Sequence, residues 1–511
     1  MIALLFGLSF GLSYGVSNHS TYLLSAFRAT HPGLLGGDWL AAQTTPYHQA
    51  FHYLAVLLYK AGAAGWPFAL ANVLFAMIAA LLLHRLAAGL TMRRTTLAVF
   101  LLLLGLNAAT STRSVAGSYL ISHVFQPSTV ATAGYLAGML CFINGRYLLA
   151  GVSLGVGGLF HANFLALGFV WFGLAHLLLG KQRLFIRLAQ NLGPSALAAI
   201  PLAPLILAVL GSPDAAVGRE IFLTIRSPHH YVPLSNWPPF AAFAGAQIIC
   251  LAVVWINGWS FPGPRPKSLA LRALLLAAVV PVWISTLLTT VVYLPGVAAA
   301  YVWRLAPFGE VLVQLVILSW VAELLVKPRE DSAWPRLANR LLVAGAALFF
   351  LTGCVYQLTT AQRKSILLRG FPPAQAELYA WARRTPVDST FLIDPSIETF
   401  RLHARRAVVV DWKSTPILPA ELLAWYDRIE TVTGEPGVRD LAQAVRGYCR
   451  MDAARLEKIA HKYAVDYVLL RRIKDCLPPR GYDVVFANSY GVVVATGRRR
   501  STSSRGASPP P

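Results

Sequence analysis

The sequence predicts an α-helical polytopic membrane protein of about 11 transmembrane helices, followed by a small C-terminal α/β domain. Two observations set the class: 56% of the 511 residues are hydrophobic and only 13% are charged. Soluble domains carry about 25% charged residues. The third observation is a series of long apolar runs separated by short charged loops. Such runs indicate membrane helices, because a spanning segment must satisfy its backbone hydrogen bonds internally.

We identify eleven apolar runs, and all but the fifth are long enough, or nearly so, to cross hydrocarbon, which takes about 20 residues. The fifth of them is short. We expect spans near residues 1–16, 66–90, 96–110, 128–144, 147–160, 163–180, 195–211, 239–257, 273–294, 302–325 and 341–358. Together they predict a multi-pass transmembrane domain over residues 1–358.

Loop charges orient these spans. If the N-terminus is cytoplasmic, the inside loops carry most of the basic residues, for example Lys181, Arg183 and Arg187, and the short outside segments carry far fewer. We therefore expect a protein of the cell inner (cytoplasmic) membrane, with its C-terminal domain extracytoplasmic. The net charge of +22 has the same explanation, so no nucleic-acid partner is expected. A further crossing near 47–64 would reverse the sides of all later loops and their charges. We therefore expect this segment to be an amphipathic interfacial helix in an outer loop.

The chain changes character at about residue 370. Strand-like and helical patterns alternate from there to residue 496, as in a small α/β domain. Asp394 and Asp411 follow predicted strands, a common position for ligand residues. Arg401, Arg405, Arg406 and Lys413 could contact the acceptor or lipid headgroups, but a solvated basic face is the expected arrangement. The Ser/Pro-rich end, 497–511, is predicted to be a disordered tail.

Asp38 is the candidate catalytic group. It follows Gly36 and Gly37 in the first outer loop, beside a stretch rich in His and Tyr. A carboxylate at a membrane surface can act as the general base for an acceptor presented by lipid. The alternative is structural: after two glycines, Asp38 would serve as a helix cap or a loop hydrogen-bond acceptor.

Basic residues expected at the outer face could hold a lipid phosphate. The candidates are Arg304, Arg113 and Arg226, and Arg304 stands out because it begins a membrane helix. A guanidinium there can bind phosphate with two hydrogen bonds. The alternatives for Arg304 are an interfacial position for its charged end, or a pair with Glu310.

Histidines form a second candidate set on the same side of the membrane. His48 and His52 are four residues apart on the predicted interfacial helix, and His161, His229 and His230 lie in outer loops. These histidines could form hydrogen bonds with a substrate, or they could be ordinary polar residues at the membrane interface. Gln49 follows His48, so the zinc-protease motif is not present. No cofactor is predicted, and no motif supports a divalent metal.

Several stretches together resemble the GT-C superfamily of membrane glycosyltransferases. These are Gly37-Asp38-Trp39, the interfacial segment after it, the glycine-rich run from Gly155 to Phe164, and the runs 463–470 and 485–494. The resemblance implies a glycosyltransferase that takes a sugar from a polyprenyl-phosphate donor on the extracytoplasmic face. Its partners would be that lipid-linked sugar and membrane lipid. Asp38 stands alone here, whereas many GT-C members have an acidic pair in the first loop, which puts a two-carboxylate or metal-assisted mechanism in doubt.

A second resemblance, carried by Gly37-Asp38-Trp39 and the run 400–413, is to a family of bacterial multi-pass proteins for which no activity is established. The competing function is therefore a non-enzymatic membrane protein, either a transporter or flippase of lipid-linked glycans or a partner in envelope assembly. The sequence has no Walker loop, no GxGxxG after a strand and no CxxC motif. Cys449 and Cys476 could form a disulfide if their domain is extracytoplasmic.

Overall fold

The computed structural model describes residues 1–497 except 47, 63–64, 92, 182, 232–236, 257–264, 327–333, 474–475, 477 and 480. The predicted tail, 497–511, lies outside the described residues apart from its first. The chain forms two compact units. Unit 1 comprises Met1–Thr30, Thr45–Gly370 and Ile417–Leu423. Unit 2 comprises His31–Thr44, Phe371–Pro416 and the described residues from Ala424 onward. The segment His31–Thr44, predicted to be the first outer loop, thus belongs to the same unit as the C-terminal domain.

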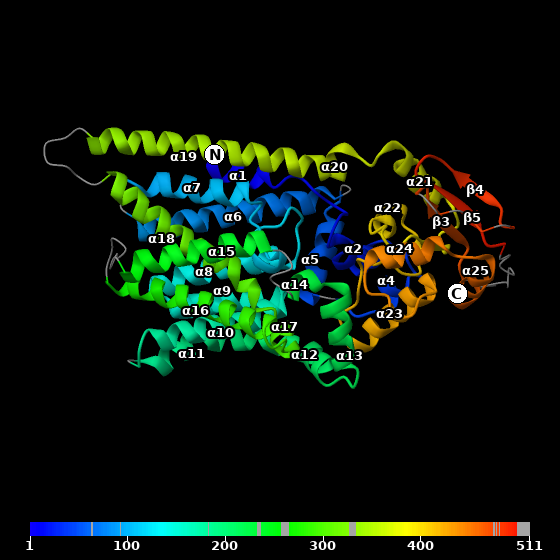
Figure 1. The fold of residues 1–511 in the computed structure, drawn as a ribbon, viewed down its shortest axis with the longest axis horizontal. Coiled ribbons are helices and arrows are strands. Elements are labelled where there is room, and N and C mark those ends of the chain that lie inside the picture. The colour runs from blue at the N-terminus through cyan, green and yellow to red at the C-terminus, as the bar shows by residue number, and fades with distance from the viewer. Residues whose placement is uncertain are drawn as a thin grey trace, which may run out of the picture. The chain divides into compact units, whose positions relative to one another are not determined.

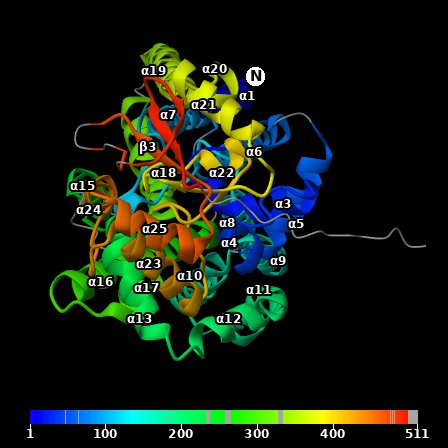
Figure 2. The ribbon, with the colours of Figure 1, turned by 90° about the vertical axis from the view of Figure 1, so that its right-hand side faces the viewer.

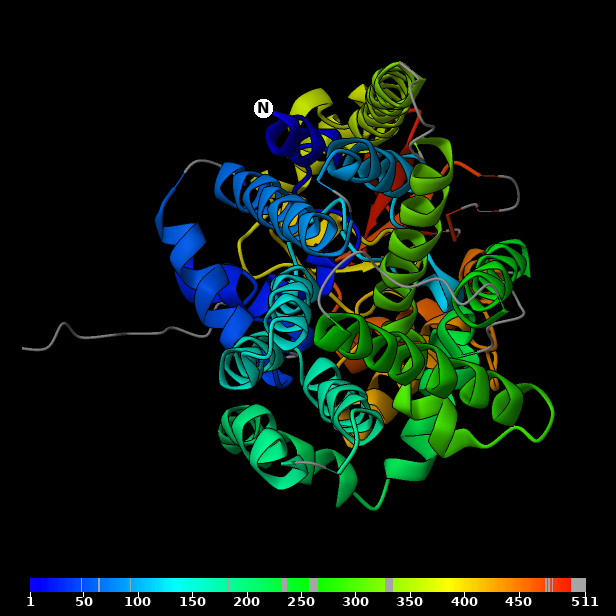
Figure 3. The same ribbon diagram turned by 90° about the vertical axis from the view of Figure 1, so that its left-hand side faces the viewer.

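Unit 1 is a bundle of apolar helices, several of which run side by side in Figure 1 and are seen nearly end-on in Figure 3. Within the described part of the chain, five helical segments are long and apolar enough to cross a membrane: Trp66–Leu90, Leu184–Leu210, Arg265–Thr290, Pro295–Val326 and Trp334–Arg363. Shorter apolar helices are Thr96–Ala109, Pro127–Ile143, Tyr147–Phe160, Ala162–Leu178 and Phe240–Ile256. Each overlaps one predicted span. The first predicted span, 1–16, is helical only over Ile2–Ser9.

The longer helices of unit 1 are α1 (Ile2–Ser9), α5 (Gln49–Lys60), α6 (Trp66–Leu90), α7 (Thr96–Ala109), α8 (Pro127–Ile143), α9 (Tyr147–Phe160), α10 (Ala162–Leu178), α11 (Leu184–Ala199), α12 (Ala203–Leu210), α15 (Trp237–Leu251), α16 (Arg265–Thr290), α18 (Ala306–Val326) and α19 (Trp334–Lys364). Short helical pieces are α2 (His19–Tyr22), α3 (Leu24–Thr30), α13 (Ala215–Glu220), α14 (Pro228–Tyr231), α17 (Pro295–Ala300) and α20 (Ile366–Arg369). The predicted interfacial segment is the helix α5. Phe51 and Ala55 are buried on one face of α5, while Tyr53 and Leu57 are exposed.

Glycines allow α9 to approach two neighbours closely. A Cβ at Gly157 would lie 3.1 Å from the carbonyl oxygen of Ala131 in α8. A Cβ at Gly151 would lie 2.0 Å from the carbonyl oxygen of Asn191 in α11. The hydroxyl of Ser195 in α11 also donates to the carbonyl of Gly151, at 2.9 Å. Small residues and interhelical hydrogen bonds of this kind hold helices together in lipid, where the hydrophobic effect does not.

Unit 2 is built on a five-stranded sheet of order β2-β1-β3-β5-β4. Its strands are β1 (Thr390–Ile393), β2 (Ala407–Val408), β3 (Tyr467–Arg471), β4 (Val484–Ala487) and β5 (Gly491–Ala495). β1 runs parallel to β2 and β3, whereas β5 runs antiparallel to β3 and β4. In register, Phe391 pairs with Val408 and Tyr467, and Leu469 pairs with Val493.

The helices of unit 2 are α4 (Trp39–Gln43), α21 (Pro373–Arg384), α22 (Phe400–Ala404), α24 (Leu441–Cys449) and α25 (Ala453–Tyr463), together with α23 (Pro419–Thr433) from Ala424 onward. Leu378 and Tyr379 of α21 and Phe400 of α22 pack on Phe391 and Ile393 of β1, which forms the core on one face of the sheet. α24 and α25 lie on the other side of the strands (Figure 2). Cys449 and Cys476 form a disulfide, while the remaining three cysteines, in unit 1, are free.

Candidate functional site

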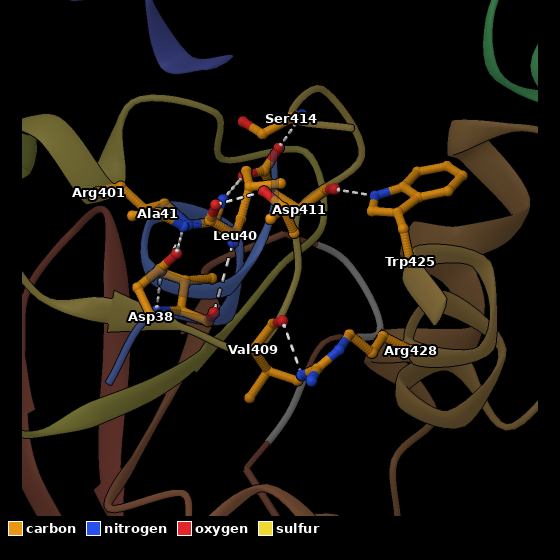
Figure 4. Close-up of polar contacts among 11 residues, drawn as sticks. Asp38, Leu40, Ala41, Arg401, Val409, Asp411, Ser414, Trp425 and Arg428 are labelled. Carbon is orange, nitrogen blue, oxygen red and sulfur yellow. Dashed lines mark hydrogen bonds and ion pairs between the residues drawn. The ribbon is translucent and has the colours of Figure 1, made fainter. Parts of the chain in front are cut away.

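Asp38 caps the short helix α4. Its backbone is extended, and its Oδ1 accepts a hydrogen bond from the backbone N–H of Ala41 at 2.9 Å (Figure 4). Carboxylates are favoured at this position because they satisfy an N–H that has no partner within the helix. The side chain is fully buried. The structural alternative predicted for Asp38 is therefore the arrangement present in the fold.

The second oxygen of Asp38 is held by the C-terminal part of unit 2. Arg401 Nε donates to Oδ2 at 2.7 Å, and the backbone N–H of Val408 donates to the same atom at 2.9 Å. Arg401 also forms an ion pair with Asp411 through Nη1, so one guanidinium bridges two carboxylates (Figure 4). Burial lowers the pKa of Arg401, but the two carboxylates more than offset it, so the pKa is raised and the side chain stays charged.

The three side chains of Asp38, Arg401 and Asp411 attach the loop that contains Asp38 to the strand β2. All three side chains are buried, and the Ser414 N–H donates to the other oxygen of Asp411 at 2.6 Å. Every oxygen of Asp38 already accepts a hydrogen bond. Asp38 is also fully buried, so these contacts would have to open before a substrate could reach its carboxylate.

The expected solvated basic face is wrong for Arg401 and Arg406, whereas Arg405 is exposed. Arg401 is 2% and Arg406 4% exposed. Arg406 donates to the carbonyl of Arg383 at 2.6 Å, and Arg401 forms ion pairs with both Asp38 and Asp411. Sequence reasoning did not find Arg401 as the partner of Asp38, because 362 residues separate the two and no local pattern links them.

In unit 1, Arg304 lies in a short turn of 3₁₀ helix, Val302–Leu305, immediately before α18. Its half-buried guanidinium lies over two aromatic rings, with Cζ 4.6 Å from the centroid of Tyr301 and 5.5 Å from that of Phe164. Among the described residues, no carboxylate forms an ion pair with Arg304. Glu310 instead accepts a hydrogen bond from the Ser114 hydroxyl at 2.8 Å. Arg304 is thus a cation held by aromatic contacts.

His48 and His161 come together although 112 residues separate them in sequence. Their ring centroids are 4.6 Å apart, and both side chains are buried or nearly so. Burial, and then the charge of Arg304, lower the pKa of His48 to about 3. Burial, Arg304 and His48 lower the pKa of His161 well below its usual value. Both imidazoles are therefore neutral at pH 7, and Arg304 is the nearby charge that acts on them.

Tyr301 connects this cluster to two further loops. Its hydroxyl lies 2.9 Å from Nδ1 of His230 and 3.1 Å from the carbonyl oxygen of Ala116. Tyr301 and Ala116 both have left-handed backbones, with φ of 49° and 54°. Such conformations cost about 1–3 kcal/mol each and tend to occur at functional sites. Sequence reasoning assigned no role to Tyr301, although an aromatic residue three positions before Arg304 was the available signal.

The structure thus brings together Arg304, His48, His161 and His230, which we call the arginine–histidine cluster. His229 is adjacent, with its ring centroid 4.1 Å from that of His230. The other predicted residues have different surroundings. Nδ1 of His52 bonds to the Ser25 hydroxyl at 2.9 Å, Arg226 donates to the Ser227 hydroxyl at 3.3 Å, and Arg113 is exposed. Within the described residues, no group of three or more His, Cys, Asp or Glu side chains could hold a metal ion.

Comparison with known proteins establishes the fold. The profile of a family described as "Domain of unknown function (DUF6798)" matches residues 374–432. No curated protein matches the sequence. The structure matches ArnT from Cupriavidus metallidurans bound to undecaprenyl phosphate, with a TM-score of 0.54 and 15% identity over 97% of this chain and 96% of that one. The apo state of the same ArnT gives a TM-score of 0.54, at 14% identity over 96% of this chain and 95% of that one.

A third match is the arabinofuranosyltransferase AftD from Mycobacteria, with a TM-score of 0.51 and 15% identity over 98% of this chain and 41% of that one. These structures are GT-C glycosyltransferases, and the resemblance predicted from the sequence is confirmed at the level of the fold. The chain is a multi-pass membrane protein with the GT-C fold and a small C-terminal α/β domain.

Proposed function

We propose that this protein is a glycosyltransferase that takes a sugar from a polyprenyl-phosphate donor at the extracytoplasmic face of the inner membrane. The arginine–histidine cluster is the proposed site for the phosphate of the donor. The observation that carries the proposal is Arg304, a half-buried cation without a carboxylate partner among the described residues, placed in the short 3₁₀ turn immediately before α18. The match to an ArnT structure bound to undecaprenyl phosphate supports the same class of lipid.

The chemistry of the cluster suits a phosphodiester. Arg304 supplies the positive charge, and its planar donors match two phosphate oxygens. The neutral imidazoles of His48 and His161 can donate N–H groups without adding charge. Phosphate is the leaving group when the sugar is transferred, so donors fixed around it would stabilise the charge that develops there.

Two features support the proposed side of the membrane. The loops predicted to be cytoplasmic carry most of the basic residues. The two cysteines of unit 2 are joined in a disulfide, whereas the three in the apolar helices are free. Disulfides persist in oxidising compartments, as expected for an extracytoplasmic domain.

Donor binding tests the role of Arg304. We would measure binding of a panel of polyprenyl-phosphate monosaccharides to the full chain in nanodiscs. Arg304→Met should weaken binding by about ten- to a hundredfold, the loss expected for hydrogen bonds to a charged group. Arg304→Lys keeps the charge but not the planar donors, so its affinity for the donor should lie between those of the wild type and Arg304→Met. Arg28→Met removes an exposed cation of α3 and serves as the matched control. Equal binding by all variants would refute the assignment.

The proposed base, Asp38, requires a control for its structural role. If Asp38 is a base that opens its contact with Arg401 during the reaction, the variant Asp38→Asn should lose at least about a hundredfold in turnover. Its donor binding should persist. Asp411→Asn disturbs the same guanidinium without removing the base, so it should retain turnover. Equal losses in both variants would make Asp38 a structural residue only. Donor binding without turnover in the wild type would favour a carrier or an assembly partner.

A further inference from the structure

The sheet of unit 2 has a switch point between two of its parallel strands. The chain leaves the carboxyl end of β1 towards β2, on one side, and leaves the carboxyl end of β3 towards β4, on the other. Sheets with parallel strands bind ligands outside the carboxyl ends at the point where the connections diverge. In this fold that point is marked by Asp394, directly after β1, and Arg471, the last residue of β3.

Polar side chains meet at this edge. Nη1 of Arg471 donates to the Ser396 hydroxyl at 2.9 Å, and Ser396 donates to Oδ1 of Asp394 at 2.7 Å. Oδ2 of Asp394 is 3.8 Å from Nη1 of Arg471, beyond ordinary hydrogen-bond length. This oxygen is buried and has no hydrogen-bond partner among the described residues. The Arg471 side chain is 35% exposed, and we infer that its movement opens Oδ2 to a ligand.

We propose that this edge binds a saccharide through Asp394 and Arg471. Two adjacent sugar hydroxyls would enter between the side chains, one donating to Oδ2 of Asp394 and the other accepting from Arg471. Such a hydroxyl would satisfy the buried oxygen, which otherwise carries a desolvation cost. The pair combines one negative and one positive group, so it suits uncharged hydroxyls. A phosphate would be repelled by Asp394.

Neighbouring contacts hold the two strands in place. The hydroxyl of Tyr448 in α24 lies 2.8 Å from the carbonyl oxygen of Leu469 in β3 and 3.3 Å from that of Leu392 in β1. The next residue, Cys449, is disulfide-bonded to Cys476, five positions after Arg471. Cys476 is therefore tied to α24, the helix whose Tyr448 contacts both strands. A site fixed before binding loses less entropy when the ligand arrives.

Identification of this saccharide as the acceptor rests on the proposed function, but binding itself does not. The test is saturation-transfer NMR on the full chain in nanodiscs, using methyl glycosides of common hexoses and pentoses as probes, with inorganic phosphate as a competitor. We expect transfer to at least one glycoside in the wild type. Asp394→Asn, which keeps an acceptor for Ser396, and Arg471→Met should each weaken its binding by about tenfold.

Arg439→Met, at an exposed arginine of the same unit, is the matched control and should bind as the wild type does. Retention of the Cys449–Cys476 disulfide would verify that the variants fold. Absence of any glycoside signal, equal signals in all variants, or displacement by phosphate would each overturn the proposal. Glycoside binding that follows the variants in a protein without transferase activity would leave this inference standing and refute the proposed function.

Discussion

His48 is a buried base held neutral, and this determines how it contributes to stability at different pH values. Its pKa falls from 6.5 to about 3 on folding, through burial and then the charge of Arg304. The unfolded chain therefore binds a proton at this residue below pH 6.5 that the folded chain does not bind until about pH 3. Stability must decrease as the pH falls through this window.

We expect His48→Gln to reduce the acid sensitivity of the protein. Between pH 6.5 and pH 5, proton uptake by unfolded His48 costs the folded state up to about 2 kcal/mol, at about 1.4 kcal/mol per pH unit. Glutamine cannot take up that proton. The measurement is the midpoint of thermal unfolding at pH 7 and pH 5: the drop should be smaller in the variant. An equal drop in both proteins would show that His48 is not held neutral in the folded state.

The residues of the candidate site that the sequence could predict are those whose chemistry is visible locally. Arg304 stands at the start of an apolar run, and His48 and His161 stand at the ends of helices, so each could be chosen by residue type and position. Their contacts depend on tertiary packing. The pairing of Asp38 with Arg401 could not be predicted, because nothing near either residue marks the other. An arginine in a basic stretch is ordinarily solvated, and only the fold places it between two carboxylates.

At the scale of elements, the glycines of α9 set how closely the helices pack. A Cβ at Gly151 would clash with the backbone of α11, which cannot move aside as a flexible side chain can. Gly89, near the end of α6, has open space around its missing Cβ. Both glycines lie in apolar helices, but a methyl group would clash with a neighbouring helix at Gly151 and would meet no atom at Gly89.

Gly151→Ala should destabilise unit 1 by about 1–3 kcal/mol, the usual cost of overpacking. Gly89→Ala, its matched control, should be neutral or stabilising by up to about 1 kcal/mol, because alanine favours helix more than glycine does. Thermal unfolding of the two variants in the same detergent checks the pair. A Gly151→Ala protein as stable as the wild type would mean that α9 and α11 are not in close contact.

Most helices could be predicted because hydrophobicity and length alone define an apolar segment. Ten of the eleven predicted spans overlap apolar helices of at least ten residues. The first run is different: Gly11 and Gly15 have positive φ, and the helix ends at Ser9 although the sequence remains apolar beyond it. Hydropathy does not register this, because glycine in an apolar run lowers helix stability without making the segment polar.

At the scale of the whole molecule, the chain combines two environments with different chemistry. Unit 1 presents apolar helices with free cysteines, and unit 2 contains a sheet, amphipathic helices and a disulfide. The segment His31–Thr44 belongs to unit 2, although it lies more than 300 residues from the rest of that unit in sequence. A domain boundary placed from composition alone divides the chain into consecutive segments. It could therefore not assign His31–Thr44 to the same unit as the C-terminal residues.

The proposed orientation makes a final prediction. A reporter that is active only outside the cytoplasm, fused after Gly370 at the end of α20, should be active. The same reporter after Gly180, between α10 and α11, should be inactive, because Lys181 and Arg183 mark that loop as cytoplasmic. The opposite pattern would place unit 2 in the reducing cytosol, where its disulfide would not persist. The extracytoplasmic site proposed for sugar transfer would then be excluded together with the orientation.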